Sequence, residues 1–466
     1  MTNRPFPEDR VHPGSFRDPS GFLFTRDRVL YRQVNVAYRD HYDLLMRSGL
    51  YKTLSEAGLL VRHEEVDIAP ADPRTATKIL KPERIPFISY PYEWCFGELK
   101  DAALATLRIQ KTAMDFGMSL KDASAYNIQF AGGRPVLIDT LSFENLQLKP
   151  WVAYRQFCQH FLGPLVLMSR KDDRLGLLSK VFLDGFPLDL AAKLLPAATR
   201  LRPGLLMHLH LHAASQKHYS GKMVDVKGKR ISIVSLAGLI SSLESVVRKT
   251  VFQLQKTEWG DYYRETNYSE AAFEEKKKII SDFLDLMKPG VVWDLGANTG
   301  VFSRLASSRG IETISFDVDH AAVELNYRQV AAEKDRHLLP LVLDLANPSP
   351  SLGWAGEERE SWIGRGPADA VFALALIHHL AISNNVPFSG IAGLLRRIST
   401  WLVIEFVPKG DSQVQRLLAT REDVFPGYTQ PDFESEFGRY FRVEKKVPVS
   451  GSERTLYLMK ARADTA

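Results

Sequence analysis

The chain has 466 residues, more than one hydrophobic core usually accommodates, so two or three domains are expected. The chain contains 60 Lys and Arg residues and 55 Asp and Glu residues. The resulting net charge of +5 is too small for this length to favour a nucleic-acid partner. Cys95 and Cys158 give neither a disulfide framework nor a zinc spacing. No signal peptide or membrane span is visible, so we expect a cytoplasmic protein.

The first part of the chain predicts an α+β domain over residues 1–220 that selects a substrate. Residues 21–25 and 29–34 are apolar runs on either side of a polar trio, as in a β-hairpin. Residues 87–92 have the composition of a strand that a proline stops, and residues 96–114 have apolar side chains at helical spacing.

A short polar motif in this domain has the spacing of a kinase catalytic loop. Asp122 and Asn127 are separated as D-x-x-x-x-N, and Asp139 ends the next apolar run beyond a Gly-Gly turn. In phosphoryl transfer a carboxylate orients the acceptor hydroxyl, while an amide and a second carboxylate hold Mg²⁺ against the phosphates. The motif resembles the kinase-like aminoglycoside phosphotransferase fold, and these three residues form a predicted phosphotransfer-like site.

The motif also departs from that family. Leu120 stands where the histidine of H-R-D would be, Thr140 and Leu141 replace the Phe-Gly after the metal-binding aspartate, and no G-x-G-x-x-G loop precedes it. The competing interpretation is a β-hairpin with a polar loop, in which Asp122 caps a turn and Asn127 bonds the backbone.

Residues 221–287 are expected to form a helical connector or lid between two domains. Residues 270–287 have helical spacing, and Ser269 before them is a typical N-cap residue. Upstream of this connector, His208 and His212 would share one face of a helix, but no nearby acid or cysteine completes a metal site. We therefore expect histidines that pack or form hydrogen bonds, and no bound metal.

The most informative motif is residues 291–300, VVWDLGANTG, in which an apolar run ends in Asp294 and is followed by Gly296 and Gly300. It predicts a buried parallel strand, a tight loop and a helix. The glycines let the backbone approach a ligand without a Cβ in the way. A dinucleotide fingerprint, G-x-G-x-x-G, would need glycine at Asn298 and again three residues later, so a pyrophosphate is poorly served.

Two further apolar runs end in carboxylates. Asp317 lies 21 residues after Gly296, where an acid can accept hydrogen bonds from both hydroxyls of a ribose, and Asp344 ends the next run. With the glycine loop, these acids resemble the motifs of class I S-adenosylmethionine-dependent methyltransferases. The resemblance implies S-adenosyl-L-methionine as the cofactor and Asp344 at its adenine amino group. It assigns the loop around the cofactor to Asp294, Gly296, Asn298 and Gly300.

Residues 370–379 resemble the fourth motif of this family, at the floor of the methyl-transfer pocket, and end in His378 and His379. Because histidine titrates near neutral pH, His379 is the expected catalytic base for a hydroxyl or amine acceptor, with His378 as the second candidate. The alternative is that one histidine belongs to the core and the other only shapes the pocket.

Other polar residues near these motifs are candidates for ligand contacts. In such methyltransferases a segment before the glycine loop often closes over the cofactor, which makes Tyr268 a candidate for its methionine end. Glu405, Lys409 and Asp411 follow the fifth apolar run at the same predicted edge of the sheet. They are candidates for acceptor contacts, and equally for loop charges or a helix cap.

The C-terminal part of the chain predicts an α/β domain. Five strand-then-helix units are followed by strand-like runs at 441–449 and 455–460, which suit a closing antiparallel hairpin. The expected fold is a seven-stranded Rossmann-like methyltransferase domain over residues 288–463, with the N-terminal α+β domain, kinase-like by its motif, before it.

Over nearly its full length the chain resembles a group of two-part methyltransferases related to the nodulation protein NoeA. The resemblance lies in residues 88–94, 119–127 and 404–409 among others. It implies an enzyme that methylates an oxygen or nitrogen of a small-molecule or glycan acceptor. Two alternatives stay open: a bifunctional methyltransferase-kinase that modifies a carbohydrate end, and a non-catalytic protein that only binds ligands.

Overall fold

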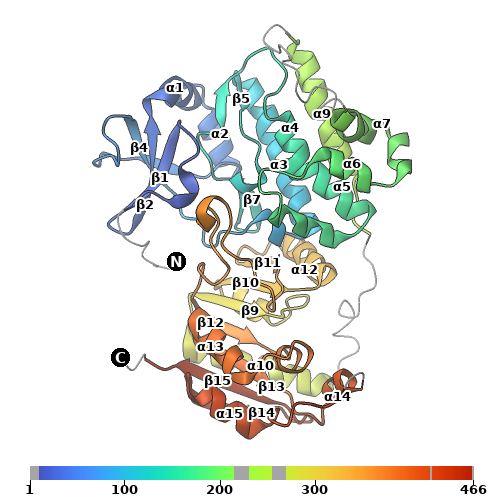
Figure 1. Cartoon of the computed structure of the whole chain (residues 1–466). Coiled ribbons are helices and arrows are strands. Elements are labelled where there is room, and N and C mark those ends of the chain that lie inside the picture. Colours follow the sequence, from blue (N-terminus) through green and yellow to red (C-terminus); the bar gives the residue numbers. More distant parts are fainter. Residues whose placement is uncertain (1–9, 215–229, 254–268, 420–421, 464–466) are drawn as a thin grey trace. The chain divides into compact units, whose positions relative to one another are not determined.

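The computed structural model describes residues 10–214, 230–253, 269–419 and 422–463. The chain divides into two compact units, whose elements are labelled in Figure 1. The N-terminal unit comprises Asn3–Gln253 together with Leu352–Arg359, and the C-terminal unit comprises Leu254–Ser351 and Glu360–Ala466.

The predicted connector, residues 221–287, contains two described helices. Helix α9 (Ile233–Lys249) belongs to the N-terminal unit and helix α10 (Glu270–Met287) to the C-terminal unit. Ser269 caps α10 as predicted, because its hydroxyl accepts a hydrogen bond from the backbone N–H of Ala272 at 3.2 Å. A lid function for this connector stays a prediction.

A four-stranded antiparallel sheet begins the N-terminal unit, in the order β1-β2-β4-β3. The predicted hairpin is confirmed, since β1 pairs with β2 across Asp27 and Arg28. Both turn residues have positive φ, the conformation that matches the twist of the two strands. The elements of this part are β1 (Gly21–Arg26), β2 (Val29–Asn35), α1 (Arg39–Arg47), α2 (Leu50–Glu56), β3 (His63–Glu65) and β4 (Ala76–Pro82).

The prediction of a strand at residues 87–92 is wrong, because this segment pairs with none of the described strands. The backbone N–H of Ser89 donates to the side-chain oxygen of Gln129, and the Ser89 carbonyl accepts from the amide nitrogen of the same side chain. One buried amide therefore takes the backbone groups that strand pairing would need. The segment then enters a 3-10 turn at Pro91–Glu93.

Helices and two small sheets complete the N-terminal unit. The long predicted helix is present as α3 (Phe96–Asp115), and β5 pairs with β8 while β6 pairs with β7. The strands are β5 (Met118–Leu120), β6 (Ile128–Ala131), β7 (Arg134–Leu137) and β8 (Phe143–Asn145). The remaining helices are α4 (Tyr154–Phe157), α5 (Gly163–Arg170), α6 (Leu188–Leu194), α7 (Pro203–Leu205) and α9.

A seven-stranded sheet forms the centre of the C-terminal unit, in the order β11-β10-β9-β12-β13-β15-β14. The first five strands are parallel, and β15 runs antiparallel to both of its neighbours. This confirms the predicted Rossmann-like sheet with its closing hairpin. The strands are β9 (Val291–Leu295), β10 (Glu312–Asp317), β11 (Leu338–Val342), β12 (Ala368–Ala373), β13 (Ser399–Phe406), β14 (Phe441–Pro448) and β15 (Thr455–Ala461).

Helices cover both faces of this sheet (Figure 1). Side chains of a strand point alternately to opposite faces, so Val292 and Asp294 of β9 face α10 and α11, while Trp293 between them contacts Trp362 on the other face. Aromatic side chains of α13 and α15 cover that second face, where Phe433 contacts Phe406. The helices are α10, α11 (Ser303–Ser307), α12 (His320–Glu333), α13 (Phe388–Ile398), α14 (Ser412–Leu418) and α15 (Gln430–Gly438).

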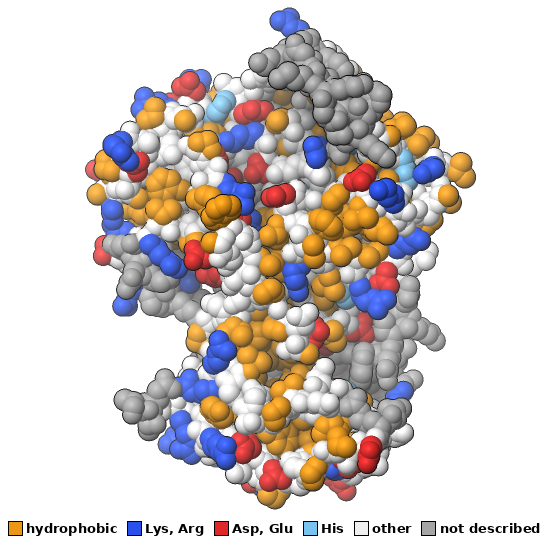
Figure 2. Space-filling view, in the orientation of Figure 1, with side chains coloured by type: hydrophobic (Ala, Val, Ile, Leu, Met, Phe, Trp, Pro, Cys, Tyr) orange, Lys and Arg blue, Asp and Glu red, His pale blue; other side chains and the backbone are white. Residues whose placement is uncertain are grey.

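The surface carries charges of both signs. On the face shown in Figure 2, Lys and Arg side chains are interspersed with Asp and Glu side chains, in keeping with the small net charge. None of the described helices has the length and apolar content that crossing a bilayer requires.

Candidate active site

A cavity of about 350 Å³ opens at the carboxyl ends of the parallel strands in the C-terminal unit. Strand β9 pairs with β10, the next strand along the chain, at one of its edges and with β12 at the other, so the strand order reverses at β9. Such a reversal of strand order leaves a crevice in which α/β sheets bind ligands. The apolar side chains that line it are Phe273, Phe302, Val318, Leu343, Leu345, Leu374, Leu376, Leu380 and Leu417.

The glycine loop after β9 bends along the cavity wall. Gly296, Asn298 and Gly300 have φ values of +72°, +52° and +78°, which favour glycine and are tolerated by asparagine. The N–H groups of Gly296 and Ala297 both donate to the carbonyl of Phe316 in the neighbouring strand, at 2.8 and 3.0 Å. The loop is therefore held to β10 by its backbone.

Asp317, at the end of β10, fixes the same loop through its side chain. The backbone N–H of Asn298 donates to Asp317 Oδ2 at 2.7 Å, and the N–H of Asp319 donates to Asp317 Oδ1 at 2.9 Å. Asp317, Asn298 and Gly296 all line the cavity. Asn298 and Asp317, which are 19 positions apart in the sequence, thus meet, because the carboxyl ends of paired parallel strands lie at one edge.

Replacing Gly300 by alanine is expected to destabilise the C-terminal unit and weaken ligand binding. A Cβ at Gly300 would lie 2.5 Å from the side-chain amide of Asn326, which is buried and donates to Ser315 Oγ. Strained φ and overpacking together should cost about 2–4 kcal/mol. Urea denaturation of both proteins measures this change.

Gly310 offers a matched control, since its φ of +76° is similar and a Cβ there would meet nothing within 4 Å. The Gly310→Ala variant should show the cost of φ alone, about 1 kcal/mol. Equal losses in the two variants would mean that Asn326 does not restrict the loop.

Two acids of the site, the buried Asp294 and the half-buried Asp317, have raised pKa values. Burial raises the pKa of Asp294 to about 7, although Ser303 Oγ donates to its carboxylate at 2.6 Å. Burial also raises the pKa of Asp317 to about 6, against the lowering effect of its hydrogen bonds from the backbone. Both side chains are poised to gain from a ligand that brings positive charge or hydroxyl donors.

The other predicted site residues separate into cavity and core. Asp344 lines the cavity, and its carboxylate caps the turn at Ala346 N at 2.8 Å. His379 also lines the cavity, at the start of a one-turn π-helix, His379–Ser383. His378 is 1% exposed and is not among the lining residues. Sequence reasoning put both histidines forward, and only His379 faces the cavity.

Burial lowers the pKa of both histidines. The pKa of His379 is about 4, with the charge of Arg454 as the second cause, and that of His378 is well below its ordinary value. Both rings are therefore neutral at physiological pH, and His379 can accept a hydrogen bond or a proton from a bound acceptor.

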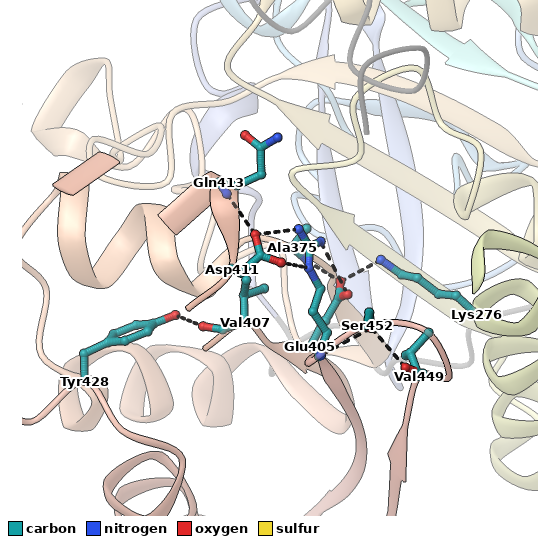
Figure 3. Close-up of polar contacts among 10 residues, drawn as sticks. Lys276, Ala375, Glu405, Val407, Asp411, Gln413, Tyr428, Val449 and Ser452 are labelled. Carbon is teal, nitrogen blue, oxygen red and sulfur yellow. Dashed lines mark hydrogen bonds and ion pairs between the residues drawn. The ribbon is translucent and has the colours of Figure 1, made fainter. Parts of the chain in front are cut away.

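A network of buried charged side chains adjoins the cavity, and Lys276, which lines the cavity, is part of it (Figure 3). Lys276 Nζ lies 2.6 Å from Glu405 Oε2, with side-chain exposures of 2% and 0%. The same Glu405 oxygen accepts the N–H of Ala375 at 2.7 Å, and Arg454 lies 3.7 Å from the other oxygen. Arg454 also makes two hydrogen bonds to Asp411, at 2.7 and 3.1 Å.

Sequence reasoning missed Lys276 and Arg454. A lysine on the buried stripe of α10, four residues after Ala272 and three before Ile279, was the available signal, because charged side chains seldom occupy such positions. Among the residues proposed for acceptor contacts, Glu405 and Asp411 serve the network, and Asp411 also caps α14. Lys409 pairs with Asp423 at the surface. Tyr268 lies outside the described residues.

The polar motif of the N-terminal unit also comes together. The Asn127 side chain lies close enough to Asp122 to lower the pKa of that carboxyl, against the raising effect of burial, and Asn127 Nδ2 donates to Ser142 Oγ at 3.4 Å. Ser142 Oγ in turn donates to Asp139 Oδ2 at 2.7 Å. Burial raises the pKa of Asp122, and the charge of Asp139 raises it further. The three predicted residues therefore belong to one connected cluster.

One feature of this cluster, an ion pair, was outside the sequence reasoning. Arg32 of β2 lies 2.5 Å from Asp139 Oδ1, in an ion pair whose side chains are 10% and 14% exposed. Asp122 also accepts the N–H of Ser124 at 2.9 Å, so the turn that the competing interpretation expected is present as well.

The predicted hydrogen bonding of the histidine motif is confirmed for His208. Its Nδ1 lies 2.8 Å from the Tyr154 hydroxyl and its Nε2 lies 2.9 Å from Ser242 Oγ. Among the described residues no group of three or more His, Cys, Asp or Glu side chains is arranged to hold a metal ion.

No family model matches the sequence. One relative matches over nearly the full length of the chain. The chain is 35% identical over 461 residues to nodulation protein NoeA of Rhizobium meliloti (strain 1021), and the match covers 95% of this chain and 94% of that protein. The chain belongs to the NoeA family. Its match to NoeA spans both units, so the two-part organisation is common to these NoeA-family proteins.

Solved structures resemble this NoeA-family chain only weakly. N-methyltransferase NodS from Bradyrhizobium japonicum WM9 is 10% identical, with a TM-score of 0.31, over 42% of this chain and 99% of that one. Magnesium protoporphyrin IX methyltransferase from Synechocystis PCC 6803, with bound SAH, is 19% identical, with a TM-score of 0.30, over 41% and 84%. The bifunctional kinase-methyltransferase WbdD is 19% identical, with a TM-score of 0.29, over 45% and 43%.

Proposed function

We propose that the C-terminal unit is a class I S-adenosyl-L-methionine-dependent methyltransferase. The observation that carries this proposal is the set of carboxylates around the glycine loop: Asp294, Asp317 and Asp344 all line one cavity. Three acids disfavour a pyrophosphate, and they suit a cofactor that carries a sulfonium and an ammonium but no phosphate.

Each acid has a partner in such a cofactor. Asp317 receives the ribose hydroxyls, and the loop residues Gly296 and Asn298 lie along the adenosine. Asp344 receives the adenine amino group, and Asp294, beside the loop, receives the methionine ammonium. The raised pKa values of Asp294 and Asp317 support this assignment, because a cationic or hydroxyl-rich ligand offsets the cost of burying their charges.

When bound, the cofactor supplies a methyl group on a positively charged sulfur. The protein then has to align the acceptor with that methyl and exclude water, which the apolar side chains of the cavity favour. His379 faces the same cavity as a neutral imidazole and accepts the acceptor's proton. His378 is buried behind it and acts as a packing residue.

Affinity for S-adenosylhomocysteine is expected to rise with pH between about 5 and 7.5. The ligand needs charged forms of Asp294 and Asp317, whose pKa values are raised to about 7 and about 6. His379, with a pKa of about 4, is neutral throughout this window. Calorimetric titration at several pH values measures the dependence.

For the stability of the folded unit without ligand, Asp294 and Asp317 give a pH dependence of the opposite sign. Because their pKa values are above the ordinary 3.8, they favour the folded ligand-free unit while protonated, and this contribution is lost as pH rises through about 6 and 7. The Asp294→Asn variant should weaken both dependences. An unchanged binding profile in that variant would remove Asp294 from the ligand site.

The acceptor is proposed to be a small molecule or a glycan, methylated on oxygen or nitrogen. Incubating the full chain with radiolabelled cofactor and cell extract, followed by separation into small molecules, glycans, protein and RNA, tests both the activity and the acceptor class. With the wild-type chain we expect label in the small-molecule or glycan fraction, and much less label with Asp317→Ala at a subsaturating cofactor concentration. No transferred label, with intact cofactor binding, would favour a non-catalytic ligand-binding protein.

We further propose that the N-terminal unit is kinase-like, as in a bifunctional methyltransferase-kinase. The connected cluster of Asp122, Asn127 and Asp139 supports this second function, with Asp122 orienting an acceptor hydroxyl and the other two holding Mg²⁺. Arg32, a cation on a strand of the N-terminal sheet beside Asp139, is suited to contact nucleotide phosphates.

Titration of the full chain with ATP in the presence and absence of Mg²⁺ tests this second proposal. We expect Mg²⁺-dependent binding that Asp139→Asn weakens, because the amide removes one metal-binding charge. Binding that does not depend on Mg²⁺, or the absence of binding, would leave the cluster with the structural function of the competing hairpin interpretation.

A further inference from the structure

The cavity has one positively charged side chain among the described residues that line it, Lys276 of α10. Its ammonium lies 4.6 Å from the ring centre of Phe302, another lining residue. Asp294, Asp317 and Asp344 supply the negative charges of the cavity, and His379 is neutral. Any anionic group of a ligand in this cavity is therefore expected to go to Lys276.

Lys276 and Asp294 together match an α-amino acid. Both line the cavity. Burial lowers the pKa of Lys276, and the charges of Glu405 and Asp294 act against that lowering. The charge of Lys276 in turn acts against the burial that raises the pKa of Asp294. The ammonium and carboxylate of an α-amino acid are attached to the same carbon, so its binding site needs an anion and a cation close together.

The buried charge network fixes the position of the Lys276 ammonium. Glu405 is completely buried and bonds Lys276 Nζ at 2.6 Å, while it also accepts the N–H of Ala375. Ala375 lines the cavity and has a φ of +48°, a conformation that its hydrogen bond to Glu405 helps to hold (Figure 3). One carboxylate thus connects the wall at α10 with the wall that follows β12.

We propose that Lys276 binds the carboxylate of the methionine part of the cofactor, beside Asp294 at the ammonium, and that Glu405 is the positioning residue that holds Lys276. The inference rests on the proposed cofactor and adds the determinant for its amino-acid end. It predicts that the cavity distinguishes ligands with this end from ligands that end at the thioether.

The test compares two ligands on the full chain by calorimetry: S-adenosylhomocysteine, which has the amino-acid end, and 5′-methylthioadenosine, which lacks it. The Lys276→Met variant should bind S-adenosylhomocysteine about 10- to 100-fold more weakly, the scale of a charge-assisted hydrogen bond, and bind methylthioadenosine almost as wild type does. Equal losses for both ligands, or no loss for either, would overturn the role of Lys276. If the wild-type chain binds neither ligand, the proposed cofactor itself is wrong.

Two further variants control for folding. Lys277, the next residue, forms a surface pair with Glu274 and does not line the cavity, so Lys277→Met should leave both affinities unchanged. If Lys276→Met does not fold because Glu405 loses a partner, the Lys276→Met/Glu405→Gln double variant removes both charges at once. It should show the same selective loss, because the ratio of the two affinities is compared within one protein. An unchanged ratio in the double variant would overturn the proposal.

Discussion

Replacing Arg454 by methionine is expected to lower the free energy of unfolding by about 3–5 kcal/mol. The Arg454 side chain is 2% exposed and makes two hydrogen bonds to Asp411, which is itself 9% exposed. Its third contact is the completely buried Glu405, at 3.7 Å. The variant would leave two buried carboxylates with fewer partners, and the energy lost is mainly the cost of their desolvation.

A surface pair in the same unit serves as the control. Lys409 and Asp423 are 2.7 Å apart, but their side chains are 29% and 44% exposed, so solvent screens the pair. Lys409→Met should leave the unfolding free energy almost unchanged. Denaturant unfolding of the wild-type chain and both variants measures the contrast. Similar small losses in the two variants would show that the buried network contributes little to stability.

Replacing Asp317 by alanine is expected to weaken the binding of S-adenosylhomocysteine by about 1.5–3 kcal/mol, or roughly 10- to 150-fold. The variant removes the carboxylate proposed for the ribose hydroxyls. It also removes the acceptor for the N–H groups of Asn298 and Asp319, at 2.7 and 2.9 Å, which hold the loop. Calorimetry with the purified full chain gives the affinity directly.

Asp319 is the matched control for Asp317, because it lies two residues further on and caps α12 instead of lining the cavity. Asp319→Ala should reduce stability by about 1 kcal/mol, as the loss of an N-cap does, and retain the affinity. Wild-type affinity in Asp317→Ala would remove this carboxylate from the cofactor site. A comparable loss in Asp319→Ala would point to general damage of the loop.

Local sequence patterns were enough to predict the strands of the C-terminal sheet and the ends of β9 and β10. Apolar runs of strand length that end in Asp294 and Asp317 encode β9 and β10, and parallel strands bring their carboxyl ends to one edge. Glycines and an asparagine at positive φ are equally local, since the backbone conformation of the loop favours these residue types. These features do not depend on which distant side chains meet.

The strand predicted at residues 87–92 failed for the opposite reason. Its composition fits a strand, but the backbone of Ser89 bonds the side chain of Gln129, 40 residues away. The sequence could not distinguish His378 from His379 for a similar reason. The two residues are adjacent and have the same chemistry, and they differ only in which one the fold turns towards the cavity. His379 faces it and His378 does not.

The sequence by itself determined which segments become strands of the C-terminal sheet, the glycine loop, and the acids that end β9 and β10, because each follows from the residues nearest to it. Only the tertiary structure decided that Lys276 meets Glu405 across 129 positions, and that Arg32 meets Asp139. A charged residue within an apolar stripe indicates a buried partner without identifying it. The partner is fixed by which faces of distant elements come together, and desolvation makes that pairing obligatory once they do.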